Sequence, residues 1–260
     1  DNGINRTNLI GTNGDGVSDA AERNVISANR WMGVLIHGSG ADRNRVAGNF
    51  IGTDRTGTKA LGNDGEGVMI HSGAQNNWIG TNSDGVGDEA EGNVISANTR
   101  NALNISGSTT MGTVIAGNYL GTDVTGTQAL GNNYHGIYLG QGARTTQIGS
   151  NGDGRGDALE RNVISGNLLD GVLIEGSGTT ENLVAGNYIG TDVSGRAAIG
   201  NGSNGVELRN AAGNTIGGTG ERNVIAGNLA NGVSINGAGS SQNVVAGNYI
   251  GTDAGGTAGL

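Results

Sequence analysis

The sequence repeats itself at an interval of 69 residues. The segment Arg23–Asn29 returns at residues 92–98, 161–167 and 222–228, so the successive offsets are 69, 69 and 61 residues. A long fixed period that keeps Val and Ile at fixed phases is typical of a solenoid, in which each unit buries its apolar face only against its neighbours. We therefore expect one continuous repeat domain over residues 1–260.

The composition narrows the fold class further. Gly supplies 54 of the 260 residues, Pro and Cys are absent, and aromatic residues make up 3% of the chain. Because the Gly residues recur between short Val and Ile runs, they predict many tight turns that join many short strands. No stretch shows the apolar spacing of an amphipathic helix, so we expect no helices. The absence of Cys excludes disulfides and thiolate metal sites.

Charge and hydropathy exclude two kinds of partner. The formal net charge is −9 and Lys59 is the single lysine, whereas nucleic-acid-binding proteins need clustered Lys and Arg. The sequence also has no apolar run of the length that a transmembrane helix requires. We therefore expect no nucleic-acid partner and no membrane insertion.

Three columns of apolar residues follow one another in a fixed order along the chain. The first is Ile10, Val46, Ile79, Ile115, Ile148, Val184, Ile216 and Val245; the second is Ile26, Ile51, Ile95, Leu120, Ile164, Ile189, Ile225 and Ile250; the third is Ile36, Ile70, Ile105, Leu139, Ile174, Leu208 and Ile235. This order predicts an all-β, single-stranded parallel β-helix with three strands per coil, in which each column forms one sheet.

The shortened last repeat indicates how many coils each 69-residue unit contains. Ile216 and Ile225 are only 9 residues apart, too few for a whole coil, although the equivalent spacing in the other repeats is 16 residues. The longer spacing is therefore a short connection with an inserted loop. Each unit then contains two coils, of 36 and 33 residues, and about eight coils at about 4.8 Å each give a rod roughly 38 Å long.

The strand motif Gly-Val-x-Ile predicts which side chains face outward. Val34 and Ile36 share one face by period-two alternation, so Leu35 and its equivalents face solvent. A set of Asn residues follows the strands at a fixed interval, and we expect them to take the left-handed backbone of sharp corners and to hydrogen-bond from coil to coil. The set is Asn29, Asn49, Asn98, Asn118, Asn167, Asn187, Asn228 and Asn248.

The pattern Asn-x-Ile-x-Gly-Asn followed by Gly-Val-x-Ile resembles the right-handed parallel β-helix repeat of the pectate-lyase-like superfamily, and it covers the whole chain. The closest likeness is to long Gly- and Asn-rich extracellular bacterial β-helix repeat proteins, which implies a secreted or cell-surface location. The superfamily includes polysaccharide lyases, hydrolases and epimerases as well as structural proteins, so the fold alone does not fix a function. The Asp-Pro-His motif of alginate epimerases and the Gly-His-Gly motif of polygalacturonases are both absent. We therefore expect no catalytic residue.

An acidic loop inserted in the first three repeats is the strongest candidate for a binding site. Its Asn, Asp, Gly, Asp and Glu fall where an EF-hand-like calcium loop has positions 3, 5, 6, 9 and 12. Gly11, Gly80 and Gly149 stand where such a loop has its leading Asp, and the alternative is a set of solvated turns. The candidate Ca²⁺ ligands are Asn13, Asp15, Asp19, Glu22, Asn82, Asp84, Asp88, Glu91, Asn151, Asp153, Asp157 and Glu160.

A second loop, which begins with Thr-Asp, recurs at residues 52–63, 121–132 and 190–201. We expect its Asp to close a turn. We also expect Leu61, Leu130 and Ile199 to fold back onto an outward-facing aromatic row, whose members are Phe50, Tyr119, Tyr188 and Tyr249.

Two pairs of polar residues occupy equivalent positions on adjacent coils. His37 and His71 would lie about 5 Å apart, but the next residue in that column is Ser106, so a metal site there lacks a third ligand. Glu175 and Arg209 form a second pair, which we expect to be an exposed ion pair between coils.

Two hypotheses for function remain open at this stage. The first is a non-catalytic structural or surface-display module, because uniform repetition leaves no unique polar cluster. The second is a carbohydrate-binding or carbohydrate-active protein, which the fold and residues such as Tyr119, Tyr138 and Tyr188 favour. Because solenoids need caps over their terminal strands, we also expect either a longer repeat array or end-to-end stacking of copies of the chain.

Overall fold

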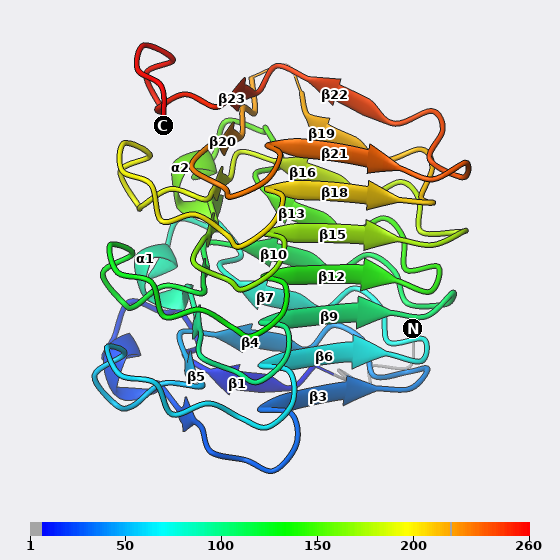
Figure 1. Ribbon diagram of the computed structural model, residues 1–260. Helices are drawn as coiled ribbons and strands as arrows, with labels where there is room; N and C mark the ends of the chain where they lie inside the picture. Colours follow the sequence, from blue (N-terminus) through cyan, green and yellow to red (C-terminus); the bar gives the residue numbers. More distant parts are fainter. Residues whose placement is uncertain (1–6, 219) are drawn as a thin grey trace.

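Short strands centred on Val and Ile stack in register from one end of the protein to the other. The computed structural model describes residues 7–218 and 220–260, and within these the strands form two eight-stranded sheets and one seven-stranded sheet, all parallel (Figure 1). The chain visits the three sheets in turn, so one strand from each makes a coil. This confirms the predicted single-stranded parallel β-helix with three strands per coil.

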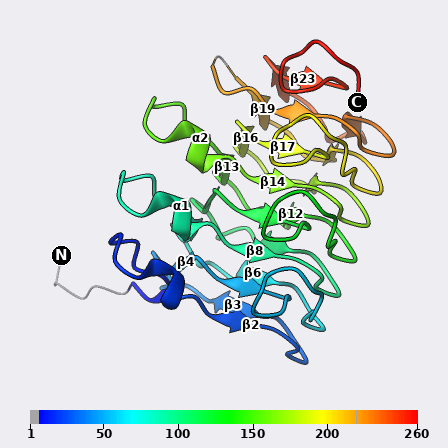
Figure 2. The ribbon, with the colours of Figure 1, turned by 90° about the vertical axis from the view of Figure 1, so that its left-hand side faces the viewer.

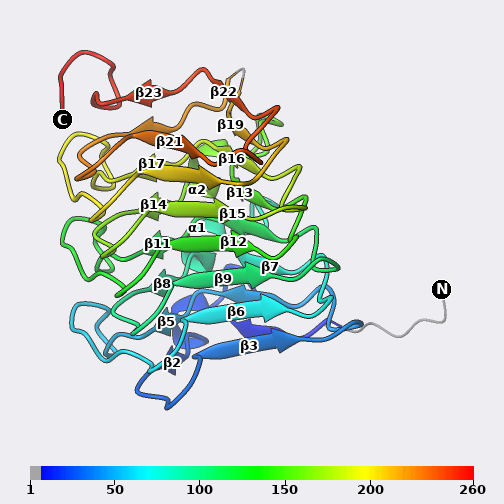
Figure 3. The same cartoon turned by 45° about the vertical axis from the view of Figure 1, so that its right-hand side comes forward.

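Each sheet corresponds to one predicted apolar column. The first sheet comprises β1 (Leu9–Gly11), β4 (Arg45–Ala47), β7 (Trp78–Gly80), β10 (Val114–Ala116), β13 (Gln147–Gly149), β16 (Leu183–Ala185), β19 (Thr215–Gly217) and β22 (Val244–Ala246). The second comprises β2 (Val25–Ile26), β5 (Phe50–Ile51), β8 (Val94–Ile95), β11 (Tyr119–Leu120), β14 (Val163–Ile164), β17 (Tyr188–Ile189), β20 (Val224–Ile225) and β23 (Tyr249–Ile250). The third, seen from the front in Figure 3, comprises β3 (Val34–His37), β6 (Val68–His71), β9 (Leu103–Ser106), β12 (Ile137–Gly140), β15 (Val172–Glu175), β18 (Val206–Arg209) and β21 (Val233–Asn236).

Short helical turns, which the sequence did not predict, lie within the acidic loops. They are η1 (Asp19–Ala21), α1 (Asp88–Glu91) and α2 (Asp157–Glu160). A residue with left-handed backbone precedes each one, and Gly87 and Gly156 fill that position before α1 and α2. These turns contain only three or four residues, too few to show the apolar periodicity that identifies a helix in a sequence. In the described part of the chain, no helix has the length and hydropathy needed to cross a membrane.

The core is the interior of the coil. Residues of each column pair directly with one another, as Ile115 does with Ile79 and Ile148, and they are almost fully buried through the middle of the stack. The predicted alternation holds in β3, where Val34 and Ile36 are buried while Leu35 is 51% exposed. Glu207, which occupies the same outward position in β18, is buried beneath polar neighbours instead.

The corner asparagines form ladders, but not the single set that the sequence suggested. One ladder runs between the first and second sheets through Asn24, Asn49, Asn93, Asn118, Asn162, Asn187, Asn223 and Asn248. Another runs between the second and third sheets through Asn29, Asn63, Asn98, Asn132, Asn167, Asn201 and Asn228. In both, each Nδ2 donates to the Oδ1 of the next coil at 2.7–3.1 Å. Coil-to-coil bonding is therefore confirmed, and the predicted set divides between two ladders.

The left-handed backbone lies one residue earlier than predicted. Ala28 and Ala97 have φ of 57° and 61°, and Gly48 and Gly117 have φ of 72° and 74°; each precedes a ladder Asn. The sharp turn of the backbone is therefore made by the residue that precedes the Asn. Gly tolerates this backbone without strain, which explains why it fills the position in most repeats.

A third ladder, between the third sheet and the first sheet of the next coil, is interrupted. Asn8, Asn44 and Asn77 are linked in its lower part, and Asn182, Asn214 and Asn243 in its upper part. Thr113 and Thr146 occupy the two intervening coils. Both are buried, and neither Oγ1 has a hydrogen-bond partner. A buried polar atom without a partner costs about 1–3 kcal/mol, so the interruption destabilises the stack.

Restoring the amides should therefore stabilise the protein. We expect the double variant Thr113→Asn/Thr146→Asn to raise the free energy of unfolding by about 1–3 kcal/mol, because two unpaired hydroxyls give way to continuous amide bonds. Chemical denaturation would measure the change. The matched control is Asn132→Thr, which creates the same interruption in an intact ladder and should lower the free energy of unfolding. Equal stability of all three proteins would contradict this account of the ladders.

Candidate functional site

The three acidic loops stack along one edge of the β-helix. Each one connects the first sheet to the second, and α1 and α2 lie one above the other there (Figure 2). The twelve predicted Ca²⁺ ligands fall into three equivalent sets of four, one in each loop. The placement of the candidate residues is therefore as regular as the repeat suggested.

Within each loop, the carboxylates accept hydrogen bonds from the loop itself. In the first loop, Asp15 Oδ1 accepts from the Val17 backbone nitrogen at 2.8 Å, and Glu22 Oε2 accepts from the Asn13 backbone nitrogen at 2.8 Å. Asp19 Oδ1 accepts from Thr12 Oγ1 at 3.0 Å. These bonds close the turns, which is the role that the alternative interpretation assigns to them.

The other two loops repeat most of this pattern. Asp84 and Asp153 accept from backbone nitrogens two residues later, and Glu91 and Glu160 accept from the nitrogens of Asn82 and Asn151. Asp88 accepts from Thr81, whereas Asp157 has Ser150 in that place and one oxygen without a partner. Over the described residues, no three His, Cys, Asp or Glu side chains converge on a common point. Calcium binding by these loops stays a prediction.

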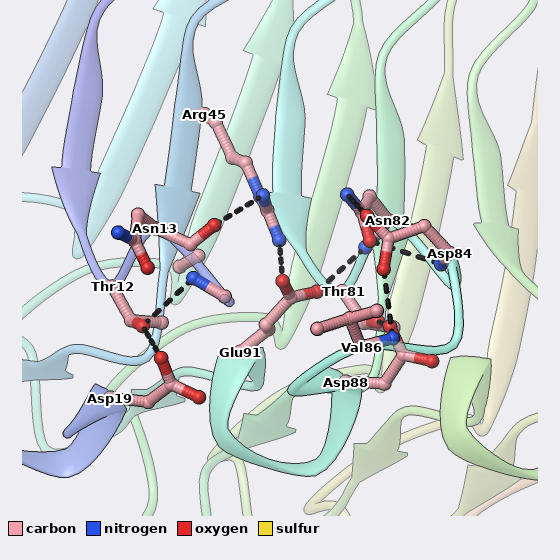
Figure 4. A network of polar contacts seen from close by, with 12 residues as sticks. Thr12, Asn13, Asp19, Arg45, Thr81, Asn82, Asp84, Val86, Asp88 and Glu91 are labelled. Carbon is pink, nitrogen blue, oxygen red and sulfur yellow. Dashed lines mark hydrogen bonds and ion pairs between the residues drawn. The ribbon is translucent and has the colours of Figure 1, made fainter. Parts of the chain in front are cut away.

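Hydrogen bonds and an ion pair also link neighbouring acidic loops. Arg45, from β4, donates through Nη1 to the Asn13 carbonyl at 3.4 Å and forms an ion pair through Nη2 with Glu91 Oε1 (Figure 4). Ser83 in the second loop donates to the Arg155 carbonyl in the third at 3.1 Å. A cavity of about 990 Å³ lies between these two loops.

The buried glutamates of the second and third loops differ in their surroundings. Glu91 is paired with Arg45, whereas Val114 occupies the corresponding position one repeat later, below Glu160. Burial raises the pKa of Glu160, although hydrogen bonds from Asn151 and Ser150 act in the opposite direction. Glu160 in the third loop is therefore a buried carboxylate without an arginine partner, whereas Glu91 in the second loop is paired with Arg45.

This difference predicts opposite effects for the same substitution. An acid with a raised pKa in the folded state binds its proton more tightly when folded, so the stability that it confers is lost as pH rises above about 4.5 and through the raised pKa. Glu160→Gln should therefore stabilise the protein at pH 7 and have no effect on stability well below pH 4.5.

The matched variant Glu91→Gln should destabilise the protein, because it leaves Arg45 unpaired. Removing one partner of a buried pair costs roughly 3–5 kcal/mol, and the 19% exposure of the Arg45 side chain places this case at the lower end. Melting temperatures measured between about pH 3 and pH 8 would test both variants. Identical pH profiles would show that Arg45 does not distinguish the two loops.

A polar row that the sequence analysis missed crosses the start of the third sheet. Its members are Asn101, His135, Asp170, Asn204 and Asn231, and each backbone nitrogen donates to the side chain of the member on the preceding coil. All of them stand two residues before a strand of the third sheet. This fixed position before the strand could have identified the row in the sequence. It was not recognised because two of its members are His and Asp instead of Asn.

His135 and Asp170 are the most enzyme-like pair in this row. His135 Nδ1 lies 3.2 Å from the Asp170 backbone nitrogen, which donates to it, and 3.1 Å from Asp170 Oδ2. Burial would raise the pKa of Asp170, but the close contact with the His135 ring and hydrogen bonds from the Asn204 backbone and from Ser203 outweigh it and lower the pKa to about 2. Asp170 is therefore ionised at neutral pH.

Charged residues beside the row pair with each other. Arg209 donates to Glu207 at 2.9 and 3.0 Å and to Glu175 at 3.3 Å. The predicted pair of Glu175 and Arg209 is thus present, with Glu207 as a closer partner that was not predicted. Burial raises the pKa of Tyr138, and the charge of Glu175 raises it further. The uniform repetition of the sequence predicted no unique polar cluster, and this group of side chains shows that prediction to be wrong.

The remaining predicted pair is also in place. The rings of His37 and His71 are 4.7 Å apart between centroids, and Ser106 follows in the same column. Burial and the neighbouring His37 lower the pKa of His71. The structure gives these two imidazoles adjacent positions, and the next residue in their column, Ser106, supplies neither a nitrogen nor a carboxylate ligand.

The Thr-Asp loops cover the aromatic row, but through other residues than predicted. Asp54 Oδ1 accepts from Thr56, Thr58 and Lys59, which confirms the closed turn. Glycines of the loops, Gly57, Gly126, Gly195 and Gly256, abut the four aromatic rings. Leu61 is 46% exposed, which does not fit the prediction that it folds onto the row. The equivalent Leu130 and Ile199 are half-buried, and for these two residues the contact stays a prediction. A glycine with positive φ lets the turn lie flat against the ring, which a branched side chain would prevent.

The fold is shared with solved structures of alginate epimerases. A single-substitution variant of the periplasmic alginate epimerase AlgG matches 79% of this chain and 35% of its own, with 16% identity and a TM-score of 0.52. A double-substitution variant matches 83% and 47%, with 13% identity and a TM-score of 0.51. The A-module of mannuronan C-5 epimerase AlgE6 from Azotobacter vinelandii matches 80% and 64%, with 16% identity and a TM-score of 0.44.

This chain thus spans 35% and 47% of the length of the two AlgG structures. No protein-family model matches the sequence, and no curated protein matches it either. At identities this low, a structural likeness establishes the fold and leaves the activity open. The chain therefore has the right-handed parallel β-helix fold of these alginate epimerase structures.

Proposed function

We propose that this chain is a non-catalytic structural module, a rigid β-helical spacer or display rod of a secreted bacterial protein. The observation that carries the proposal is the role of His135 and Asp170 in the polar row. Nδ1 of His135 accepts the Asp170 backbone N–H, and Asp170 accepts from Asn204, as the equivalent Asn side chains of the row do. The pair that most resembles catalytic machinery thus has a complete structural role.

The charges around the row support the same proposal. A protein that acts on an acidic sugar needs a cation free to bind the sugar carboxylate. Arg209 is held by Glu207 and Glu175, so its charge is already balanced by two carboxylates. A uronate approaching this face would meet a net negative group. The uninterrupted register of the three sheets also favours a rod, because each coil contacts only its neighbours and transmits load along one axis.

A carbohydrate-active protein is the second candidate, and one observation favours it. His135, Tyr138 and Asp170 lie close together near the amino-terminal ends of β12 and β15, in the middle of the stack. The His135 and Tyr138 rings are 6.5 Å apart between centroids. A histidine oriented by a carboxylate and placed beside a tyrosine can serve proton transfer at a sugar carbon. The fold shared with alginate epimerases is consistent with such a role, although it does not establish one.

Two substitutions of His135 distinguish the candidates. Asn fills the same position elsewhere in the row, so His135→Asn keeps an acceptor for the Asp170 N–H and should change the free energy of unfolding little. His135→Ala leaves that buried N–H unpaired and should cost about 1–3 kcal/mol. If the chain is a rod, neither variant alters any reaction with acidic or neutral polysaccharides, because the original protein produces none.

The measurements are chemical denaturation and a product assay over a polysaccharide panel, including alginate with detection of C-5 epimerisation by proton NMR. Turnover that disappears in His135→Asn, a variant whose stability is retained, would reject the structural proposal and support the enzyme. Loss of stability in His135→Asn would reject the assigned role of the row.

We further propose that the acidic loops bind Ca²⁺ and so stiffen one edge of the rod. The support is the repeated set of Asn, Asp and Glu oxygens at EF-hand-like spacing. The hydrogen bonds within each loop already define its turns, so the cation would add to a formed loop rather than fold it.

This proposal predicts a melting temperature that rises with calcium and falls again on addition of a chelator. A ligand at 100 times its Kd stabilises the folded state by about 2.7 kcal/mol for one site. The triple variant Asp15→Asn/Asp84→Asn/Asp153→Asn should lose the shift. Asp54→Asn, in the Thr-Asp loop, is the matched control and should keep it. A melting temperature of the original protein that is the same with calcium and with chelator would reject the proposal.

A further inference from the structure

Arginine side chains cover the aromatic row on the outer face of the second sheet. The guanidinium carbons of Arg23, Arg161 and Arg222 lie 4.2, 4.3 and 3.9 Å from the ring centroids of Phe50, Tyr188 and Tyr249. Each Arg precedes its aromatic partner by 27 residues, which places it on the preceding coil. A cation at this distance over a ring face is attracted by the ring quadrupole.

A backbone carbonyl completes the binding of each guanidinium. Nε of Arg23 donates to the Gly48 carbonyl at 2.9 Å, Nε of Arg161 donates to the Gly186 carbonyl at 3.2 Å, and Nε of Arg222 donates to the Gly247 carbonyl at 3.0 Å. The fold thus builds the same guanidinium site in three of its four repeats, from one ring face and one carbonyl oxygen.

The second repeat has the site without its arginine. Gly92 stands where the other repeats have Arg, and Tyr119 is the corresponding aromatic residue. In the described part of the chain, the Gly117 carbonyl, which is the equivalent acceptor, receives no hydrogen bond. A cavity of about 430 Å³ occupies the space, lined by Tyr119, Gly92 and Gly117.

The tight corner explains why this repeat cannot supply its own arginine. A Cβ atom added to Gly92 would collide with the Gly117 carbonyl oxygen. The site is therefore kept open by the backbone and not by a mobile side chain.

The charged side chains around the cavity balance one another. Asp88 and Glu89, from α1, line it. Arg23 and Arg161 border it as well, but the guanidinium of each is already stacked on its own ring and bonded to its own carbonyl. The two carboxylates thus offset the flanking positive charges. Both oxygens of Asp88 already accept hydrogen bonds from Thr81 and Gly85, so Glu89, in whose place the first and third repeats have Ala, is the added acceptor.

We propose that this cavity binds the guanidinium group of an arginine side chain presented by a partner polypeptide. The group would stack on Tyr119 and donate to the Gly117 carbonyl, as the protein's own arginines do in the neighbouring repeats. A lysine ammonium has neither the planar shape for stacking nor the fixed donor geometry of the guanidinium. This inference is independent of whether the chain is a rod or an enzyme.

The test is an NMR titration of the full chain with N-acetyl-arginine methylamide. We expect saturable shifts of the Gly92 and Gly117 amide signals and of the Tyr119 ring, with a millimolar Kd. The lysine analogue and the uncharged citrulline analogue should bind at least about tenfold more weakly, because the first lacks the planar fork and the second lacks the charge.

Two matched variants locate the site. Tyr119→Leu should weaken arginine binding by about tenfold or more, whereas Tyr188→Leu, at a ring already covered by Arg161, should leave it unchanged. Filling the site with Gly92→Arg is not a suitable test, because a side chain at this position needs a local backbone shift. The Tyr119 variant therefore decides the result, and the same spectra report whether it is folded. No saturable shift at Gly92, Gly117 and Tyr119 would overturn the proposal. Equal binding of citrulline, or stronger binding of an oligouronate at the same signals, would also overturn it.

Discussion

Hydrogen bonds between stacked corner amides are the interaction on which this β-helix depends. The strands of the second sheet are only two residues long, yet they keep one register through all eight described members. A two-residue strand makes few ladder bonds, so its own pairing specifies register weakly. An Asn lies on either side of each of them except the last, β23, as Asn93 and Asn98 do around Val94–Ile95, and both of these are bonded to the next coil. The corners therefore fix the register that the shortest strands cannot fix themselves.

The apolar columns were predictable from the sequence because their signal is local and repeated. Val and Ile recur at each strand, and a break in register would expose them, so spacing alone gave the sheets and their order. The ladders were harder to assign, because Asn49 and its amide partner Asn93 are 44 residues apart and stand in different contexts. The left-handed corner was assigned to Asn, whose tolerance of that backbone is known, whereas Ala28 and Gly48 carry it.

The candidate sites show where sequence spacing stops being informative. The acidic loops hold the predicted residues in the predicted order, but spacing does not determine which atom a carboxylate meets, and Glu22 meets the Asn13 backbone nitrogen. His135 and Asp170 were overlooked because neither residue type repeats in its column. Gly92 looked like one more glycine in a glycine-rich chain. It became informative only when the structure placed Arg23, Arg161 and Arg222 over aromatic rings at its equivalent positions.

The amide ladders also give the molecule a chemical direction. Along the main ladders, each Asn Oδ1 accepts from the coil before it, as the bonds of Asn93 to Asn118 and of Asn118 to Asn162 show. Nδ2 donates to the Oδ1 of the following coil and also to a backbone carbonyl of the preceding one. The ladder Oδ1 acceptors therefore all face the preceding coil, which gives the stack two unlike ends. Another coil, from this molecule or from a second copy, can join only in the same orientation. Continuation of the ladders is therefore vectorial.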